Sequence, residues 1–173
     1  MVKDIYSGGI SSEAGTGGIA VIGDTIFFRA RDQSNGYELW KSDGTANGTV
    51  MVKDIRSGGS GSPKYLAAVG NTLYFSADDG VHGRELWKSD GTVDGTVMVK
   101  DIWSGTSSGQ PGSNSYWFTP IGDTLYFSAN DGIHGEELWK SDGTVDGTVM
   151  VKDIKSGDSS DHSYPGMLTA VGN

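Results

Sequence analysis

The eight residues ELWKSDGT occupy positions 38–45, 85–92 and 137–144 without a single change. A second motif, MVKDI, begins at residues 1, 51, 98 and 150, so the 173-residue chain repeats itself at intervals of 47 to 52 residues. Repeats of this length are typical of propellers, solenoids and other arrays of small units. The residues between the two motifs decide among these classes.

Each repeat contains four short runs that are rich in β-branched and aromatic residues, as strands are. In residues 65–102, the clearest copy, the runs are LAAV, TLYFSA, RELWKS and TVMVKDI. The first two flank a Gly-Asn pair at 70–71, a connection typical of tight hairpins, and Gly-Asp repeats it at 23–24 and 122–123. No stretch has a helical period of ten or more residues. Each repeat is therefore predicted to be a four-stranded antiparallel meander.

A sheet of about 45 residues with apolar side chains on both faces needs a neighbouring sheet on each side. Radial packing of such sheets is the β-propeller. A helical solenoid is disfavoured because the sequence predicts no helix, and a parallel β-helix is disfavoured because the sequence predicts hairpins. We expect an all-β chain of propeller blades, forming one repeat array over residues 1–173. It consists of an outer strand at 1–5, blades at 19–55, 65–102 and 116–154, and an inner strand at 167–173.

Three blades are too few for a closed propeller, which has about four to eight. The chain is therefore expected to be part of a longer propeller, to join other copies in a ring, or to grow as an open fibre through its exposed edges. Because MVKDI at the start is itself repeat material, we expect Met1 to be an internal residue of a longer protein or the start of a trimmed chain.

ELWKSDGT resembles the motif that names the ELWxxDGT repeat family of secreted or surface-exposed bacterial proteins, which are similar to β-propeller blades. The resemblance covers three whole repeats and the pieces that flank them. It implies a bacterial extracellular or cell-surface location. It implies no catalytic residues.

The motif itself is predicted to be structural. If the hairpin after RELWKS closes symmetrically, Glu85 faces Lys100, and Glu38–Lys53 and Glu137–Lys152 repeat this pair, worth about 0.2–1 kcal/mol. Leu and Trp point to opposite faces of the strand, so each can contact a different neighbouring sheet. Asp-Gly in SDGT favours a turn. The residues assigned to this framework are Glu38, Trp40, Asp43, Glu85, Trp87, Asp90, Glu137, Trp139 and Asp142.

Composition narrows the classes of partner. The net charge of −9 argues against nucleic acid, whose phosphates attract clustered Lys and Arg. The chain has no cysteine, which excludes disulfides and thiolate metal sites. No apolar run approaches the roughly 20 residues that cross a bilayer, so no membrane span is expected. An acidic, glycine-rich surface suits cations or neutral ligands such as sugars.

Acidic loops make calcium the one metal to consider, since calcium takes carboxylate, amide and carbonyl oxygens. The first repeat departs from the others, with Arg31 and Asn35 where the second has Asp78 and His82. His82 and His134 lie in separate repeats, so a zinc site is not expected. Calcium ligands and ordinary turn residues both stay open for the candidates Asp78, Asp79, Asn130 and Asp131. No motif requires a cofactor.

No nucleophile elbow or phosphate-binding loop precedes a helix, and the chain is expected not to be an enzyme. A glycan-active hydrolase stays open as an alternative, because it needs only paired carboxylates about 5–9 Å apart.

The connections between repeats, at 6–18, 56–64, 103–116 and 155–165, are the most variable part of the chain and are expected on one face. Such a face often binds ligands, and aromatic rings there can stack on sugars or anchor a protein. Rings that cap the packing of blades are the alternative. We therefore predict a binding or adhesion module for a glycan or surface protein, with a structural subunit of a fibre or ring as the competing class. The candidate ligand-binding residues are Tyr6, Trp103, Tyr116, Trp117 and Tyr164.

Overall fold

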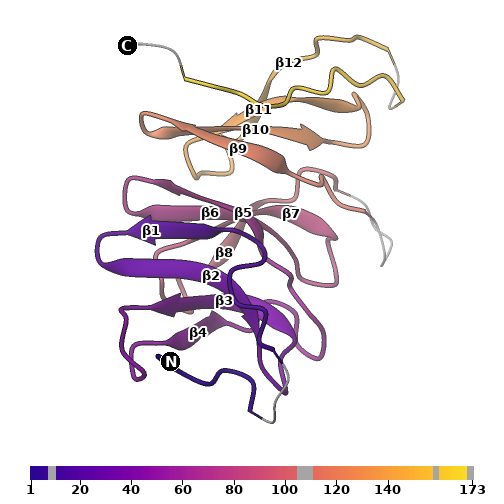
Figure 1. Cartoon of the computed structure of the whole chain (residues 1–173). Coiled ribbons are helices and arrows are strands. Elements are labelled where there is room, and N and C mark those ends of the chain that lie inside the picture. Colours follow the sequence, from indigo (N-terminus) through magenta and orange to yellow (C-terminus); the bar gives the residue numbers. More distant parts are fainter. Residues whose placement is uncertain (8–10, 105–110, 158–159, 171–173) are drawn as a thin grey trace.

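A computed structural model describes residues 1–7, 11–104, 111–157 and 160–170 of the chain (Figure 1). This part contains no helix and folds into three antiparallel sheets of four strands each. Sheet 1 consists of β1 (Ile19–Ile22), β2 (Thr25–Arg31), β3 (Tyr37–Ser42) and β4 (Val50–Lys53). Sheet 2 consists of β5 (Lys64–Val69), β6 (Thr72–Asp78), β7 (Arg84–Ser89) and β8 (Val97–Lys100). Sheet 3 consists of β9 (Tyr116–Ile121), β10 (Thr124–Asn130), β11 (Glu136–Ser141) and β12 (Val149–Lys152).

The strands of each sheet follow their order in the chain, which confirms the predicted meanders. The first hairpin of each sheet closes over two residues, as the Gly-Asn and Gly-Asp pairs predicted. In sheet 2 the last paired residues before the turn are Val69 and Thr72, and Gly70 between them has a φ of +56°. Glycine adopts this left-handed conformation without the steric cost that a side chain brings.

The sheets pack face to face, with sheet 2 in the middle of the array (Figure 1). Leu86 lies in one apolar cluster with Leu125 and Phe127 of sheet 3. Trp87, the next residue, lies in another cluster with Phe27 of sheet 1. The prediction that Leu and Trp of the motif contact different neighbouring sheets is therefore confirmed for sheet 2.

The first strands of neighbouring sheets lie against each other, β1 with β5 and β5 with β9. These strands form the inner edge of the array, and β4, β8 and β12 form its outer edge. The three sheets make an open array and not a closed ring.

The predicted pairing of Glu85 with Lys100 is wrong. The ladder between β7 and β8 contains a bulge, which places Lys100 opposite Leu86, and the same shift occurs in sheets 1 and 3. The extra residue of a bulge moves all following side chains by one position. The Glu38–Lys53 and Glu137–Lys152 pairs are therefore also absent, and Lys53 and Lys100 bind the next sheet instead.

The strands expected at the two ends of the chain are not formed: residues 1–5 and 167–170 carry no strand, and 171–173 lie outside the described residues. A strand needs a hydrogen-bonded neighbour, and no strand of the described residues pairs with either segment. The first segment still lies in the expected place. Lys3 Nζ donates to the carbonyl of Thr49 (2.7 Å), as Lys53 Nζ does to Thr96 and Lys100 Nζ to Thr148 (both 2.8 Å).

Candidate functional site

The SDGT part of the motif closes the loop between the third and fourth strands of each sheet through local hydrogen bonds. In sheet 2 the hydroxyls of Ser89 and Thr96 are 2.7 Å apart, and Ser89 Oγ accepts the N–H of Gly91 (2.9 Å). The carboxylate of Asp90 accepts the N–H and the hydroxyl of Thr92 (2.8 and 2.7 Å). Sheets 1 and 3 repeat each of these contacts. The serine, aspartate and threonine are therefore used by the loop itself.

The glutamate of the motif fixes the connection to the next sheet. Glu85 is fully buried, and its carboxylate accepts the N–H groups of Ile102 (3.1 Å) and Ser113 (2.8 Å). Glu38 binds the corresponding N–H groups of Ile55 (2.9 Å) and Gly61 (2.6 Å). In sheet 3 the carboxylate of Glu137 accepts the N–H of Ile154 (3.0 Å) and the hydroxyl of Ser163 (2.7 Å).

Glu38 and Glu85 have an unusual ionisation. Burial raises the pKa of Glu38 and of Glu85 to about 7, although the N–H groups that each carboxylate accepts act in the opposite direction. Their hydrogen bonds explain why the motif requires Glu at this position.

A different feature repeats at the inner edge of the array. Tyr65, Trp117 and Met167 occupy equivalent positions of the repeat and have φ values of +58°, +57° and +51°, in the left-handed region. Gly18 holds the position in the first repeat, with a φ of +104°. In β5 and β9 the residue sits at a bulge in the ladder. A left-handed backbone costs a side chain about 1–2 kcal/mol, and such conformations cluster at functional sites.

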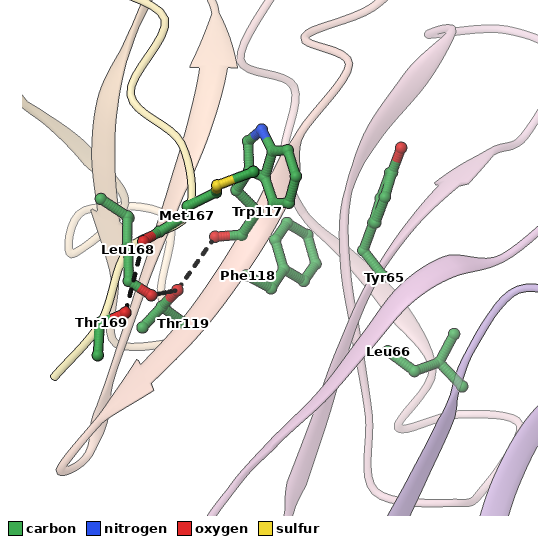
Figure 2. Close-up of a pocket in the computed structure, with 8 residues that line it drawn as sticks. All are labelled: Tyr65, Leu66, Trp117, Phe118, Thr119, Met167, Leu168 and Thr169. Atoms are coloured by element: carbon green, nitrogen blue, oxygen red, sulfur yellow. Dashed lines mark hydrogen bonds between the residues drawn. The ribbon is translucent and has the colours of Figure 1, made fainter.

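The three side chains surround a pocket of about 420 Å³ (Figure 2). Tyr65 and Trp117 are 47% and 44% exposed, large fractions for aromatic residues. Figure 2 shows Trp117 and Met167 on one side of the pocket and Tyr65 on the other. The residues that line it are Tyr65, Leu66, Trp117, Phe118, Thr119, Met167, Leu168 and Thr169.

Of the predicted ligand-binding residues, Trp117 lies in this pocket and Tyr116 lies beside it. Trp117 lines the pocket, and the Tyr116 ring lies 6.1 Å from the Trp117 ring and 6.3 Å from that of Tyr65. Burial and the hydrogen bond that Tyr116 donates to Glu136 (2.8 Å) raise the pKa of Tyr116 to about 12. Tyr116 therefore acts as a neutral hydroxyl.

A third candidate, Tyr164, lies in the connection after sheet 3 and is 66% exposed. Its ring packs against that of His162, with 5.0 Å between the centroids.

The other two predicted residues do not join the pocket. Tyr6 lies against sheet 1, with the Arg31 guanidinium 5.3 Å from the centre of its ring. Trp103 packs on Gly132, where an added Cβ would lie 2.6 Å from the indole. The sequence analysis missed Tyr65 and Met167. Their equivalence to Trp117 in the repeat was the available signal, because equivalent positions of a repeat share one place in the fold.

The calcium candidates are engaged in turn contacts. Asp79 accepts the N–H groups of Val81 and His82 (2.8 and 2.9 Å) and contacts the His82 ring (2.7 Å). Burial alone would raise the pKa of Asp79, but the contacts with His82 lower it overall and raise the pKa of His82. Asp131 and His134 repeat this arrangement.

The remaining candidates make similar contacts: Asp78 pairs with Arg56 (3.0 Å), and Asn130 Oδ1 accepts the N–H of Gly132 (2.7 Å). No group of three or more metal-ligating side chains gathers within the described residues. Calcium binding and the absence of catalysis both stay predictions.

Neither known protein families nor curated proteins give a match to this chain. Among solved structures it is similar to a computationally designed protein called Ika8, with a TM-score of 0.40 and 14% sequence identity. The alignment covers 75% of this chain and 34% of the designed one. A similarity this weak decides neither fold nor function. Within the described residues, no helix is present that is long and apolar enough to cross a membrane.

Proposed function

We propose that the three sheets are blades of a β-propeller and that the protein is a non-enzymatic binding module of the bacterial cell surface. The ligand of the module is a neutral saccharide, held against the rings of Tyr65 and Trp117. The resemblance of the ELWKSDGT motif supports the location.

The single observation that carries this proposal is the repeated left-handed backbone at Tyr65, Trp117 and Met167. Glycine would fit these positions without strain, yet large side chains occupy them and remain exposed around the pocket. The Tyr65 ring packs against those of Tyr116 and Phe118 (6.3 Å to each), and its exposed remainder faces the pocket.

The pocket chemistry favours a saccharide. Tyr65 and Trp117 offer ring faces to the C–H groups of a sugar, and Thr119 adds a hydroxyl at the pocket wall. A sugar without charge also avoids the repulsion that the net charge of −9 exerts on anions.

The test is a calorimetric titration with soluble cello-, malto-, xylo- and chito-oligosaccharides. We expect one of these series to bind and Trp117→Ala to abolish that binding, while Tyr6→Ala, outside the pocket, leaves it unchanged. Failure of all four series to bind would contradict the saccharide proposal.

A second variant separates binding from stability. Trp117→Gly removes the ring and relieves the left-handed strain, so we expect lost binding without a lower free energy of unfolding. A clear loss of stability would show that the ring serves packing, as the alternative drawn from the sequence holds.

A further inference from the structure

The outward face of sheet 3 is an exposed copy of a face that is buried elsewhere in the molecule. In sheet 2 the corresponding face is covered by sheet 3, and Val99 and Ile102 on it are 4% and 6% exposed. Val151 and Ile154 are the equivalent residues of sheet 3, and they are 46% and 56% exposed. We call this surface the open face of sheet 3; it consists of Tyr126, Leu138, Val151 and Ile154.

Sheet 1 carries the matching half of such an interface at the other end of the array. Leu73, Phe75, Ala77 and Trp87 are the side chains that sheet 2 turns toward sheet 1. Their equivalents in sheet 1 are Ile26, Phe28, Ala30 and Trp40, which we call the front face of sheet 1. Ile26 is 39% exposed where Leu73 is fully buried, and an apolar hollow of about 150 Å³ lies beside it.

Polar contacts complete the match. At both internal interfaces a lysine of the third strand reaches the next sheet: Lys41 Nζ donates to the Gly91 carbonyl and Lys88 Nζ to that of Gly143, both at 2.8 Å. Lys140 is the equivalent lysine of sheet 3. Lys140 is exposed and has no hydrogen-bond partner within the described residues.

The fourth strand offers a second lysine of this kind. Lys53 and Lys100 each donate to a threonine carbonyl of the next sheet, and Lys152 is their exposed equivalent in sheet 3. The corresponding acceptor on sheet 1 is the carbonyl of Thr49, which Lys3 now holds.

Residues 1–5 lie over the front face of sheet 1, where Phe28, Ala30 and Trp40 are at most 6% exposed and Ile26 stays open. Their sequence, MVKDI, is identical to that of residues 150–154. Ile5 packs against Phe28, Ala30 and Trp40, and Met1 and Val2 are fully or half exposed. At the inner edge, residues 167–169 lie beside β9 in a similar way, with Thr119 Oγ1 donating to the Leu168 carbonyl (3.3 Å).

We propose that the open face of sheet 3 binds the front face of sheet 1 of a second copy of this chain, and that residues 1–5 are a cover displaced by this contact. In the joined state Lys152 takes the Thr49 carbonyl from Lys3, and Lys140 reaches the carbonyl of Gly44. The second copy's Gly18 and β1 take the place of residues 167–169 beside β9, so that Met167 leaves the pocket in the joined state while Tyr65 and Trp117 stay in it. This inference does not depend on saccharide binding.

The number of copies follows from geometry. Head-to-tail contacts of this kind generate a ring or an open fibre. Closed rings of four-stranded sheets hold about four to eight sheets, and with three sheets per chain two copies give the multiple that fits.

The first experiment is light scattering of the full chain after size exclusion, over a range of concentrations. We expect the mass to rise from 18.2 kDa to twice that value and to stop there. Growth without limit would overturn the closed ring of two copies, and a monomer at every concentration would overturn the contact itself.

Full-chain variants then locate the interface. Ile154→Lys places a charge in the open face of sheet 3 and should raise the dissociation constant about a hundredfold or more. The matched control is Val145→Lys, which adds the same charge to an exposed loop of sheet 3 and should change nothing. Equal effects of the two variants would contradict the assignment of the face.

The cover is tested by Lys3→Ala, which removes the bond to Thr49 and should lower the dissociation constant several-fold. A higher dissociation constant would mean that residues 1–5 belong to the interface instead of covering it.

Because the chain has no cysteine, the head-to-tail arrangement can be trapped chemically. A chain with Lys152→Cys and a chain with Ala46→Cys should be joined by a short bis-maleimide when mixed. Neither variant should be joined to itself. Crosslinking of the Lys152→Cys variant alone would indicate a symmetric contact between two open faces and would overturn the proposal.

Discussion

Two kinds of connection in this molecule are closed in opposite ways. The side-chain hydrogen bonds made within the loop between β7 and β8 join residues at most seven positions apart, such as Ser89 with Thr96, and Lys41 and Lys53 of sheet 1 add contacts from outside. The connection from β8 to β9 is held by Glu85, whose acceptor oxygens bind N–H groups 17 and 28 residues away. The internal hydrogen bonds of the first kind need only the sequence of the loop, whereas the second kind forms only when the sheet is complete.

The largest loss of unfolding free energy should come from removing the hydrogen bonds that Glu85 makes to the distant connection. In Glu85→Ala, two buried N–H groups lose their acceptor, and each such loss costs about 1–3 kcal/mol. We expect urea unfolding to show a lower free energy of unfolding by that sum. Glu85→Gln keeps an acceptor oxygen and should lose clearly less, so equal losses would argue against the hydrogen bonds as the cause.

The stability that Glu38 and Glu85 contribute should also depend on pH. The folded-state pKa values of Glu38 and Glu85, about 7, exceed the ordinary value of 4.5. The folded protein therefore binds more protons than the unfolded chain between these values, and stability falls as pH rises. We expect a fall on the order of 1 kcal/mol for each carboxyl between pH 5 and pH 6.5.

This pH range isolates the glutamates. The raised pKa values of His82 and His134 give stability that is fully present below pH 6.5 and is lost only above it. Unfolding of a Glu38→Gln, Glu85→Gln double variant should be independent of pH in this range. A slope that survives in the double variant would assign the effect to other groups.

The hydrogen bonds within the loop between β7 and β8 should contribute less to the free energy of unfolding. In Thr96→Val the buried hydroxyl that contacts Ser89 and the Thr92 carbonyl is lost, which costs about 1 kcal/mol. Thr148→Val in sheet 3 is the matched variant and should have the same effect, because the loops are identical. A much larger effect at one site would show that the loop depends on its neighbouring sheet.

The smallest effect is expected at the exposed end of the same loop. Asp90→Ala removes acceptors for Thr92, but water replaces them because Asp90 is exposed. The loss of unfolding free energy should be below that of Thr96→Val in the same urea titration. The reverse order would mean that the aspartate, and not the buried hydroxyl pair, closes the loop.

The candidate site was predictable only in part. Tyr116 and Trp117 could be chosen as aromatic residues at the end of a variable connection, and both lie at the pocket. Tyr65 follows the connection 56–64 directly, as Trp117 follows 103–116, so comparing equivalent positions of the repeat would have found it, whereas Met167 has no ring that could mark it. The left-handed backbone at Tyr65 and Trp117 lies at bulges in the ladder, and a bulge depends on the partner strand, which the sequence does not show.

The sequence by itself determined the meanders, the two-residue hairpins and the opposite directions of Leu86 and Trp87. These features follow from strand periodicity and from hydrogen bonds between residues close in the chain. Only the tertiary structure decided that Glu85 is buried beneath a distant connection. It also decided that Val99 is covered while Val151, in the same MVKDI motif, is exposed. Burial depends on which sheet lies next to a residue, and identical sequences at the middle and the end of an array have different neighbours.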